Sequence, residues 1–219
     1  KICKICKKFN IKIIEDAAEG LGSFYKNKHL GTYGDFGILS FNGNKIITTG
    51  GGGAVIAKNK SDIDFISNIG NVAKSNHPFE LYNVSLGYNY KMPNLNASLG
   101  FSQFKKIKNF LIYKKNLNKI YHKKLNKFYN NLRLVKNHEH TKSNFWLQGI
   151  VVNSVKLRNL IIKTCNKNNI FLKPIWRPLH KSKYLKVKFC QKNLSNTIYL
   201  EKRLISLPSG LGILKNEKK

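Results

Sequence analysis

The sequence predicts an α/β fold built in two parts. Three short apolar runs near the start are typical of strands, at residues 11–15, 33–41 and 54–57. A stripe of apolar residues at helical spacing follows over residues 94–130, and strand-like and helix-like segments then alternate a second time. We therefore expect one domain over residues 1–130, which includes the long helix, and a small α/β domain over residues 131–219.

The first elements place a carboxylate and a glycine-rich loop. Residues 1–8, KICKICKK, resemble the last turns of an amphipathic helix, so the chain is expected to begin partway through a fold. The run at residues 11–15 ends in Asp16, at the carboxyl end of a strand, where open α/β sheets bind ligands. The glycines Gly50–Gly53 suit a sharp turn of the backbone close to a ligand, although a plain flexible turn fits them equally well.

The remaining elements follow in order. A helix is expected over residues 61–70, and then an irregular excursion over residues 74–94 that contains two prolines. The long helix begins at Asn94 as its N-cap and ends near Asn130. The last part is predicted to contain a strand (residues 145–153), a helix (155–167) and a second strand (170–175). A loop through Pro174 and Pro178 and a final helix (193–204) follow.

The charge of the chain raises the possibility of a nucleic-acid partner. The formal net charge is +30, because 40 lysines and arginines face 10 aspartates and glutamates. Only four of these basic residues are arginines, and the lysines are spread over the whole chain. We favour a compositional bias over a nucleic-acid-binding surface, which stays an alternative.

The cysteines and the hydropathy favour a protein of the cytoplasm. Cys3 and Cys6 form a C-x2-C pair, but no second pair or histidine cluster completes a zinc site, and Cys165 and Cys190 stand apart. We expect reduced thiols and no metal. Apolar runs long enough for a membrane span and a signal peptide are not visible in this sequence.

One group of residues has the chemistry of a pyridoxal phosphate (PLP) site. Lys45 follows Ser40 in the segment SFNGNK, just before the four glycines, and Asp16 lies upstream. A primary amine can hold the cofactor aldehyde as a Schiff base, a carboxylate can pair with the pyridine nitrogen, and a hydroxyl can bind the phosphate.

Five segments, in order and spacing, resemble the DegT/DnrJ/EryC1/StrS family of sugar aminotransferases. They are IEDAAEGLGS, GTYGDFGILSFNGNKIITTGGGG, LGYNYKMPNLNASLGFSQ, PIWRPLH and LPSG. The resemblance implies the PLP-dependent transferase fold type I, as in aspartate aminotransferase, and a homodimer with shared active sites. It is closest to members that act in legionaminic-acid-type or related bacterial sugar pathways. It also implies that the N-terminal part of the large domain, with another phosphate-binding loop, lies outside these 219 residues.

The resemblance assigns a role to each site residue. Lys45 matches the Schiff-base lysine, which argues for the transaminating branch over the dehydrating one, where histidine replaces it. Asp16 matches the carboxylate at the pyridine nitrogen, and Ser40 matches the phosphate-binding hydroxyl. Glu19 stands where many members carry glutamine near the ring's 3′ oxygen. Asn89 matches the residue that reaches the phosphate from the other subunit.

The implied substrates are an amino-acid donor, glutamate by expectation, and a nucleotide-linked keto-deoxysugar for surface glycan biosynthesis. Trp176, Arg177 and His180 lie in a segment that resembles the sugar-nucleotide side of the pocket, although packing of a loop explains them equally well. Two alternatives stay open, an inactive or incomplete fragment of such an enzyme and a basic nucleic-acid-binding protein.

Overall fold

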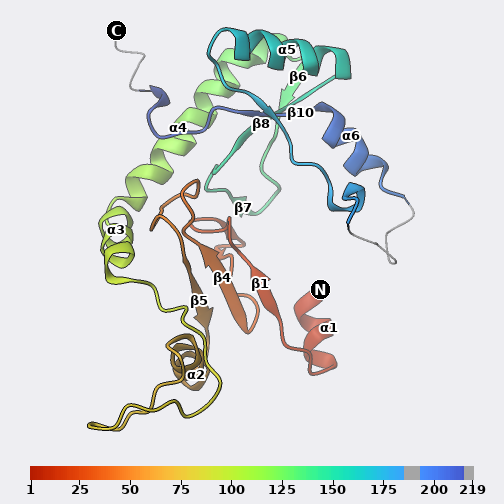
Figure 1. Ribbon diagram of the computed structural model, residues 1–219. Coiled ribbons are helices and arrows are strands. Elements are labelled where there is room, and N and C mark those ends of the chain that lie inside the picture. Colours follow the sequence, from red (N-terminus) through yellow and green to blue (C-terminus); the bar gives the residue numbers. More distant parts are fainter. Residues whose placement is uncertain (185–192, 215–219) are drawn as a thin grey trace. The chain divides into compact units, whose positions relative to one another are not determined.

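The computed structural model of the protein describes residues 1–184 and 193–214 (Figure 1). The chain forms two compact units. Unit 1 comprises Lys1–Leu111 and His138–Asn144, and unit 2 comprises Ile112–Asn137 and Phe145–Lys219. Cys190 lies outside the described residues. The predicted domain boundary between residues 130 and 131 stays a prediction.

The main sheet of unit 1 has the strand order β1-β4-β5. Its strands are β1 (Ile14–Asp16), β4 (Phe36–Ser40) and β5 (Gly53–Ala57). Strand β1 runs parallel to β4, with Asp16 opposite Ile38, and β5 runs antiparallel to β4, with Gly53 opposite Ser40. Asp16 and Ser40 therefore both lie at the carboxyl ends of parallel strands, the position that the sequence predicted for Asp16.

The second strand is shorter than the predicted residues 33–41, because a turn held by Glu15 occupies its start. The Glu15 carboxylate accepts hydrogen bonds from the backbone N–H groups of Gly31, at 2.9 Å, and of Gly34. Gly31 has a φ of 86°, which favours glycine. This turn sets where β4 begins. It therefore also sets the position of Ser40, the last residue of that strand.

A second sheet of unit 1 was not predicted. It has the order β3-β2-β7 and contains β2 (Phe24–Tyr25), β3 (Lys28–His29) and β7 (Thr141–Lys142). Lys26 and Asn27 connect β2 to β3, with φ values of 46° and 60° that suit a hairpin turn. Strand β7 arrives from more than a hundred residues along the chain, so local pattern could not reveal it.

The helices before unit 2 correct one prediction. Helices α1 (Ile2–Lys8) and α2 (Lys60–Gly70) lie where they were expected. The single helix predicted over residues 94–130 is wrong. The segment forms α3 (Asn94–Phe104), α4 (Ile107–Leu125) and the short η1 (Asn126–Phe128), and Pro93 rather than Asn94 is the N-cap. The Lys106 N–H bonds the carbonyl of Gln103, three residues back, at 2.9 Å, and this tighter turn separates the helices.

Unit 2 is an antiparallel sheet with helices packed against it. The sheet has the order β6-β8-β10-β9, and its elements are β6 (Leu132–Leu134), β8 (Gln148–Val152), β9 (Lys173–Pro174), β10 (Leu204–Leu207), α5 (Val155–Lys167), α6 (Ser195–Arg203) and η2 (Leu179–Lys181). Its core contains the buried Ile150, Val152, Leu172, Ile205 and Leu207. The Ser154 hydroxyl caps α5 by accepting the Leu157 N–H at 3.1 Å, at the predicted start of that helix.

The last helix, predicted over residues 193–204, begins two residues later and ends one residue earlier than expected, and the strand after it was missed. Helix α6 ends at Arg203, and β10 follows without a break. Ile205 is fully buried in β10, which lies between β8 and β9. Burial of alternate side chains in the sheet stabilises the extended conformation over Leu204.

A buried polar cluster joins α4 to the end of β10 within unit 2. Lys114 is buried, and its Nζ donates to the carbonyl oxygens of Trp146, at 3.1 Å, and of Ser209. Gln148 donates its backbone N–H to the Ser209 hydroxyl at 2.8 Å and accepts the side-chain amide of Asn118 at 2.7 Å. Burial lowers the pKa of the Lys114 amine.

Candidate cofactor site

The carboxylate of Asp16 stands at the carboxyl end of β1, where the strand gives way to a tight loop. Its Oδ1 accepts the Ala18 N–H at 3.1 Å, and Asp16 itself is exposed while Ala17 beside it is buried. This loop lines a hollow of about 620 Å³, formed by Glu15, Asp16, Ala17, Ala18, Glu19, Gly20 and Leu30. The hollow gives the Asp16 carboxylate access to a bound molecule.

Lys45 comes to this loop from the turn that follows β4. Its Nζ lies 3.4 Å from Oε1 of Glu19, and only 14% of its side chain is exposed, against 57% for Glu19. The turn is closed by the Lys45 N–H, which donates to the Asn42 carbonyl at 3.0 Å. Ile46 and Ile47 are buried directly after it, so the base of the lysine is anchored while its amine reaches the Glu19 loop.

Ser40 is the last residue of β4, and it lies at the same end of the sheet as Asp16. Its hydroxyl oxygen is 3.4 Å from the Asn42 N–H, and the residue is half-buried. A hydroxyl at this position can donate to an anionic group placed beyond the edge of the sheet. The structure thus brings Asp16 and Ser40 to the same end of the sheet, and it pairs Lys45 with Glu19.

The glycine loop after Lys45 requires its glycines at particular positions. Gly50 and Gly52 have φ values of 78° and 110°, in the region that side chains rarely adopt. A Cβ atom on Gly53 would stand 2.3 Å from the Leu39 carbonyl oxygen, whereas one on Gly51 would have nothing within 4 Å. The loop is a defined turn that returns the chain to β5, and three of its four glycines are needed for it.

Two residues of α3 brace the same loop and were missed from the sequence. The side-chain oxygen of Gln103 accepts the Thr48 N–H at 2.9 Å, and the side-chain amide of Asn96 donates to the Thr49 carbonyl at 2.6 Å. Asn96 and Gln103 are seven residues apart, which places them on one face of a helix. Two amide side chains at this spacing among apolar residues were the signal that could have identified them.

The Glu19 loop is held by a residue distant in sequence. The side-chain amide of Asn144 donates to the carbonyls of Glu19, at 2.7 Å, and of Leu21, at 2.9 Å. Its own N–H donates to the Ser23 hydroxyl at 3.0 Å, and the residue is buried. Because these bonds fix the backbone on both sides of Gly20, the partner of Lys45 is held in a defined loop.

Asn89 does not join this group within unit 1. It is exposed in the irregular excursion after α2, where it forms a β-bridge with Asn71. Helix α2 follows Ala57, which pairs with Phe36 at the opposite end of β4 from Ser40. Figure 1 shows the excursion extending from the neighbourhood of α2.

The three residues expected on the substrate side belong to unit 2. The Trp176 ring stacks on that of Trp146, with centroids 6.1 Å apart and planes at 19°, and 65% of Trp176 is exposed. Arg177 is exposed, and His180 is half-buried in η2. The hydrogen bond from Lys181 lowers the pKa of the Glu201 carboxyl, and the charges of His180 and Arg177 add to this effect.

Neither a metal site nor a membrane span emerges from the described parts of the chain. Residues 1–184 and 193–214 contain no group of three or more histidine, cysteine, aspartate or glutamate side chains that could hold a metal ion. Within the same ranges, every helix is too short or too polar to cross a bilayer. Cys3, Cys6 and Cys165 have free thiols.

Comparison with known proteins gives one consistent result. The profile of the DegT/DnrJ/EryC1/StrS aminotransferase family matches residues 1–218. The chain is 32% identical over 212 residues to GDP-perosamine synthase of Escherichia coli O157:H7, an alignment that covers 95% of this chain and 56% of the relative. The chain therefore spans about half the length of the curated relatives that it matches.

Solved structures share the fold. PseC of Helicobacter pylori, an aminotransferase involved in the biosynthesis of pseudoaminic acid, matches with a TM-score of 0.85 and 23% identity, over 96% of this chain and 57% of PseC. The PLP form of Spr1654 from Streptococcus pneumoniae matches with a TM-score of 0.75 and 25% identity, over 94% of this chain and 54% of that one. These matches confirm the predicted α/β fold.

Proposed function

Because this chain belongs to the DegT/DnrJ/EryC1/StrS aminotransferase family of PLP-dependent enzymes, we propose that it acts in the transfer of an amino group to a nucleotide-linked deoxysugar. The amino group comes from glutamate, and the acceptor is a keto group of the sugar. The observation that carries the proposal is the ion pair of Lys45 with Glu19, since it holds a largely buried primary amine at the loop that Asp16 begins.

The donor set of the site fits PLP. The cofactor presents an aldehyde, a ring nitrogen that a carboxylate can hold protonated, and a phosphate. Lys45 would hold the aldehyde, Asp16 the ring nitrogen and Ser40 the phosphate, and the last two lie at one edge of the sheet. When bound, PLP supplies an electron sink for the charge that develops at the α-carbon of the amino donor.

The chain's own residues supply the proton transfers and the orientation. Lys45 Nζ would accept the proton from the α-carbon of the donor, which requires the amine to be uncharged at that moment. The Glu19 carboxylate, 3.4 Å away, accepts a hydrogen bond from this amine and keeps it directed at the loop. The Asp16 carboxylate would accept a hydrogen bond from the ring N–H and so favour the charged form of the pyridine ring.

The remaining roles concern the substrate and the assembly. Trp176, with one face on Trp146 and the other exposed, offers a surface on which a planar group of the sugar nucleotide can stack. Arg177 and His180 would bind its phosphates.

Asn89, exposed in the excursion, would reach the phosphate of the cofactor in a second copy of the chain, so that the active unit is a homodimer. We assign the enzyme to surface-glycan synthesis of the legionaminic-acid type.

A half-reaction with glutamate tests this proposal. The purified chain is loaded with PLP, glutamate is added, and the visible absorbance of the cofactor is followed. The absorbance should fall with glutamate in the unaltered chain, and Asp16→Asn should slow the fall by roughly a hundredfold because the ring loses its charged partner. Asp62→Asn removes the same charge from the first turn of α2, at a half-buried residue that does not line the hollow, and should leave the rate unchanged. A rate that is the same in all three proteins would contradict the role of Asp16.

A second candidate is a form of this protein that does not hold the cofactor by itself. The chain spans 56% of the Escherichia coli relative, and Ile14 of β1 is 67% exposed. Exposed apolar surface on a strand is costly unless something covers it. A chain that folds but shows no saturable PLP absorbance would favour this candidate.

A further inference from the structure

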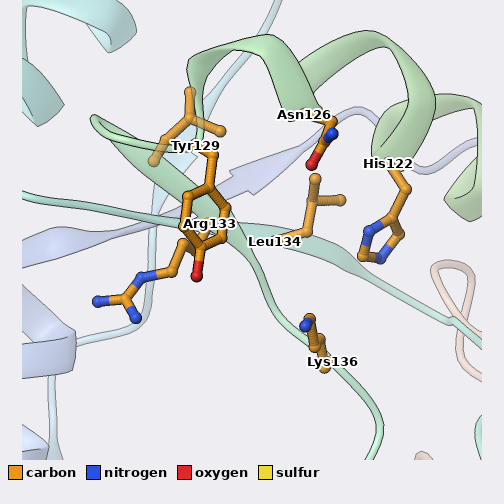
Figure 2. Close-up of a pocket in the computed structure, with 7 residues that line it drawn as sticks. His122, Asn126, Tyr129, Arg133, Leu134 and Lys136 are labelled. Carbon is orange, nitrogen blue, oxygen red and sulfur yellow. The ribbon is translucent and has the colours of Figure 1, made fainter.

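The free edge of the unit 2 sheet carries a hollow that the proposed reaction does not use. The hollow has a volume of about 390 Å³, and the residues that line it are His122, Asn126, Tyr129, Leu132, Arg133, Leu134 and Lys136. Figure 2 shows His122 and Asn126 on one side, Tyr129 and Arg133 on the other, and Lys136 below them. Small-molecule sites have volumes from about 300 Å³ upward, so the hollow is large enough for a ligand.

The basic side chains of this hollow lack a counter-ion. The side chains of Arg133, Lys136 and His122 form no hydrogen bond or ion pair with any residue of the described ranges. Glu201 is the one acidic side chain among the described residues of unit 2, and it is paired with Lys181. Positive charges gathered around a concavity attract an anion, because the low-dielectric walls concentrate their field.

The arginines of unit 2 differ in whether their guanidinium groups find an acceptor, and Arg177 and Arg133 have none among the described residues. Two other arginines of unit 2 have acceptors for their guanidinium groups. Arg158 donates to the Glu201 carbonyl at 3.2 Å, and Arg203 donates to the Asn153 carbonyl at 3.4 Å. Arg133 has no such acceptor among the described residues, although it lies on a strand directly beside the hollow.

The backbone of β6 adds hydrogen-bond donors on the side that faces away from β8. In the pairing of β6 with β8, the Val135 N–H bonds the Gly149 carbonyl at 3.0 Å, and the Asn153 N–H bonds the Asn131 carbonyl at 2.9 Å. Antiparallel pairing alternates, so the N–H groups of Leu132 and Leu134 point away from β8. Strand β6 is at the edge of the sheet, so these two N–H groups are available to a ligand, beside the carbonyl groups of the same residues.

We propose that this hollow binds a small phosphorylated molecule with a planar group, of the size and chemistry of a nucleoside diphosphate. Arg133 binds the phosphates through its fork of donors, and Lys136 adds a second charge. The Tyr129 ring, which is 59% exposed, provides a face on which the planar group stacks. The site lies outside the residues assigned above to PLP and the sugar nucleotide, and its occupation does not depend on transamination.

The test measures binding of inorganic pyrophosphate and of UDP to the 219-residue chain by calorimetry at low ionic strength. One equivalent of pyrophosphate should bind saturably, and Arg133→Gln should weaken it roughly tenfold or more, because a charge-assisted hydrogen bond is lost. Lys163→Gln removes the same charge from an exposed position of α5 and should change the affinity by no more than about twofold. Tyr129→Ala should weaken UDP roughly tenfold and leave pyrophosphate unchanged, because only UDP has a base to stack.

Other outcomes would overturn the proposal. Equal affinities of Arg133→Gln and Lys163→Gln for pyrophosphate would show general attraction to a basic chain. Loss of pyrophosphate binding in Ser40→Ala but not in Arg133→Gln would assign the bound anion to the predicted cofactor site. Binding of several equivalents, or a far higher affinity for a single-stranded RNA than for UDP, would identify a polyanion surface instead.

Discussion

The Nζ atom of Lys45 lies 3.4 Å from Oε1 of Glu19, although 26 residues separate the two in sequence. Each residue occupies a loop that follows a different strand, Glu19 after β1 and Lys45 after β4. The parallel pairing of these strands brings the two loops to one edge of the sheet, where Asp16 and Ser40 also lie.

Glu19→Gln should leave the fold intact and bind PLP at least as tightly as the unaltered chain. The Glu19 side chain is 57% exposed, so loss of its ion pair should change the free energy of unfolding by no more than about 1 kcal/mol. Removal of a carboxylate should also reduce repulsion of an anionic cofactor. Urea denaturation and a PLP titration measure the two effects. A tenfold loss of PLP affinity would mean that the charge of Glu19 is required.

Gly53→Ala should destabilise the chain, whereas Gly51→Ala in the same loop should not. A Cβ atom on Gly53 would stand 2.3 Å from the backbone oxygen of Leu39, which cannot move without disturbing β4. The expected cost is about 1–3 kcal/mol for Gly53→Ala and within about 0.5 kcal/mol for Gly51→Ala. Urea denaturation of both variants measures the difference, and equal stabilities would contradict the described path of the loop.

Lys114 should make the stability of the chain rise with pH on the alkaline side. Burial lowers the pKa of its amine below the ordinary value of 10.5, so between the folded pKa and 10.5 the unfolded chain binds more protons than the folded one. Stability therefore increases as pH rises through that window. The free energy of unfolding, measured against pH, should show this gain relative to Lys114→Met.

Lys115→Met is the matched control for Lys114→Met, because Lys115 is the next residue on α4 and is exposed. Its pH profile should parallel that of the unaltered chain. A Lys114→Met profile that is also parallel to the unaltered chain would show that Lys114 keeps its ordinary pKa in the fold.

Local pattern predicted the elements whose side chains alternate or repeat within one segment. Helix α5 covers Val155–Lys167, the range predicted for it, and Ser154 caps its start. Strand β10 was missed because its apolar run directly follows α6, with no glycine or proline between them to mark the change. Strand β2 was missed because two-residue strands depend on partners, here β3 and the distant β7.

The same limit applies to the site. The chemistry of Lys45, Asp16 and Ser40 could be proposed from residue types and order along the chain. The contacts that hold them could not, since Asn144 reaches the Glu19 loop from 125 residues away and the Lys45 loop is braced from α3. Such contacts arise from tertiary packing, which a one-dimensional pattern does not encode.

The central claim is that Lys45 is the amine that holds the cofactor. The measurement is the visible absorbance of the chain titrated with PLP, recorded for the unaltered protein, for Lys45→Ala and for Lys115→Ala as a control with an exposed lysine. We predict one saturable equivalent of absorbance in the unaltered protein and in Lys115→Ala, and its loss in Lys45→Ala. An absorbance that is unchanged in Lys45→Ala would contradict the assignment of Lys45.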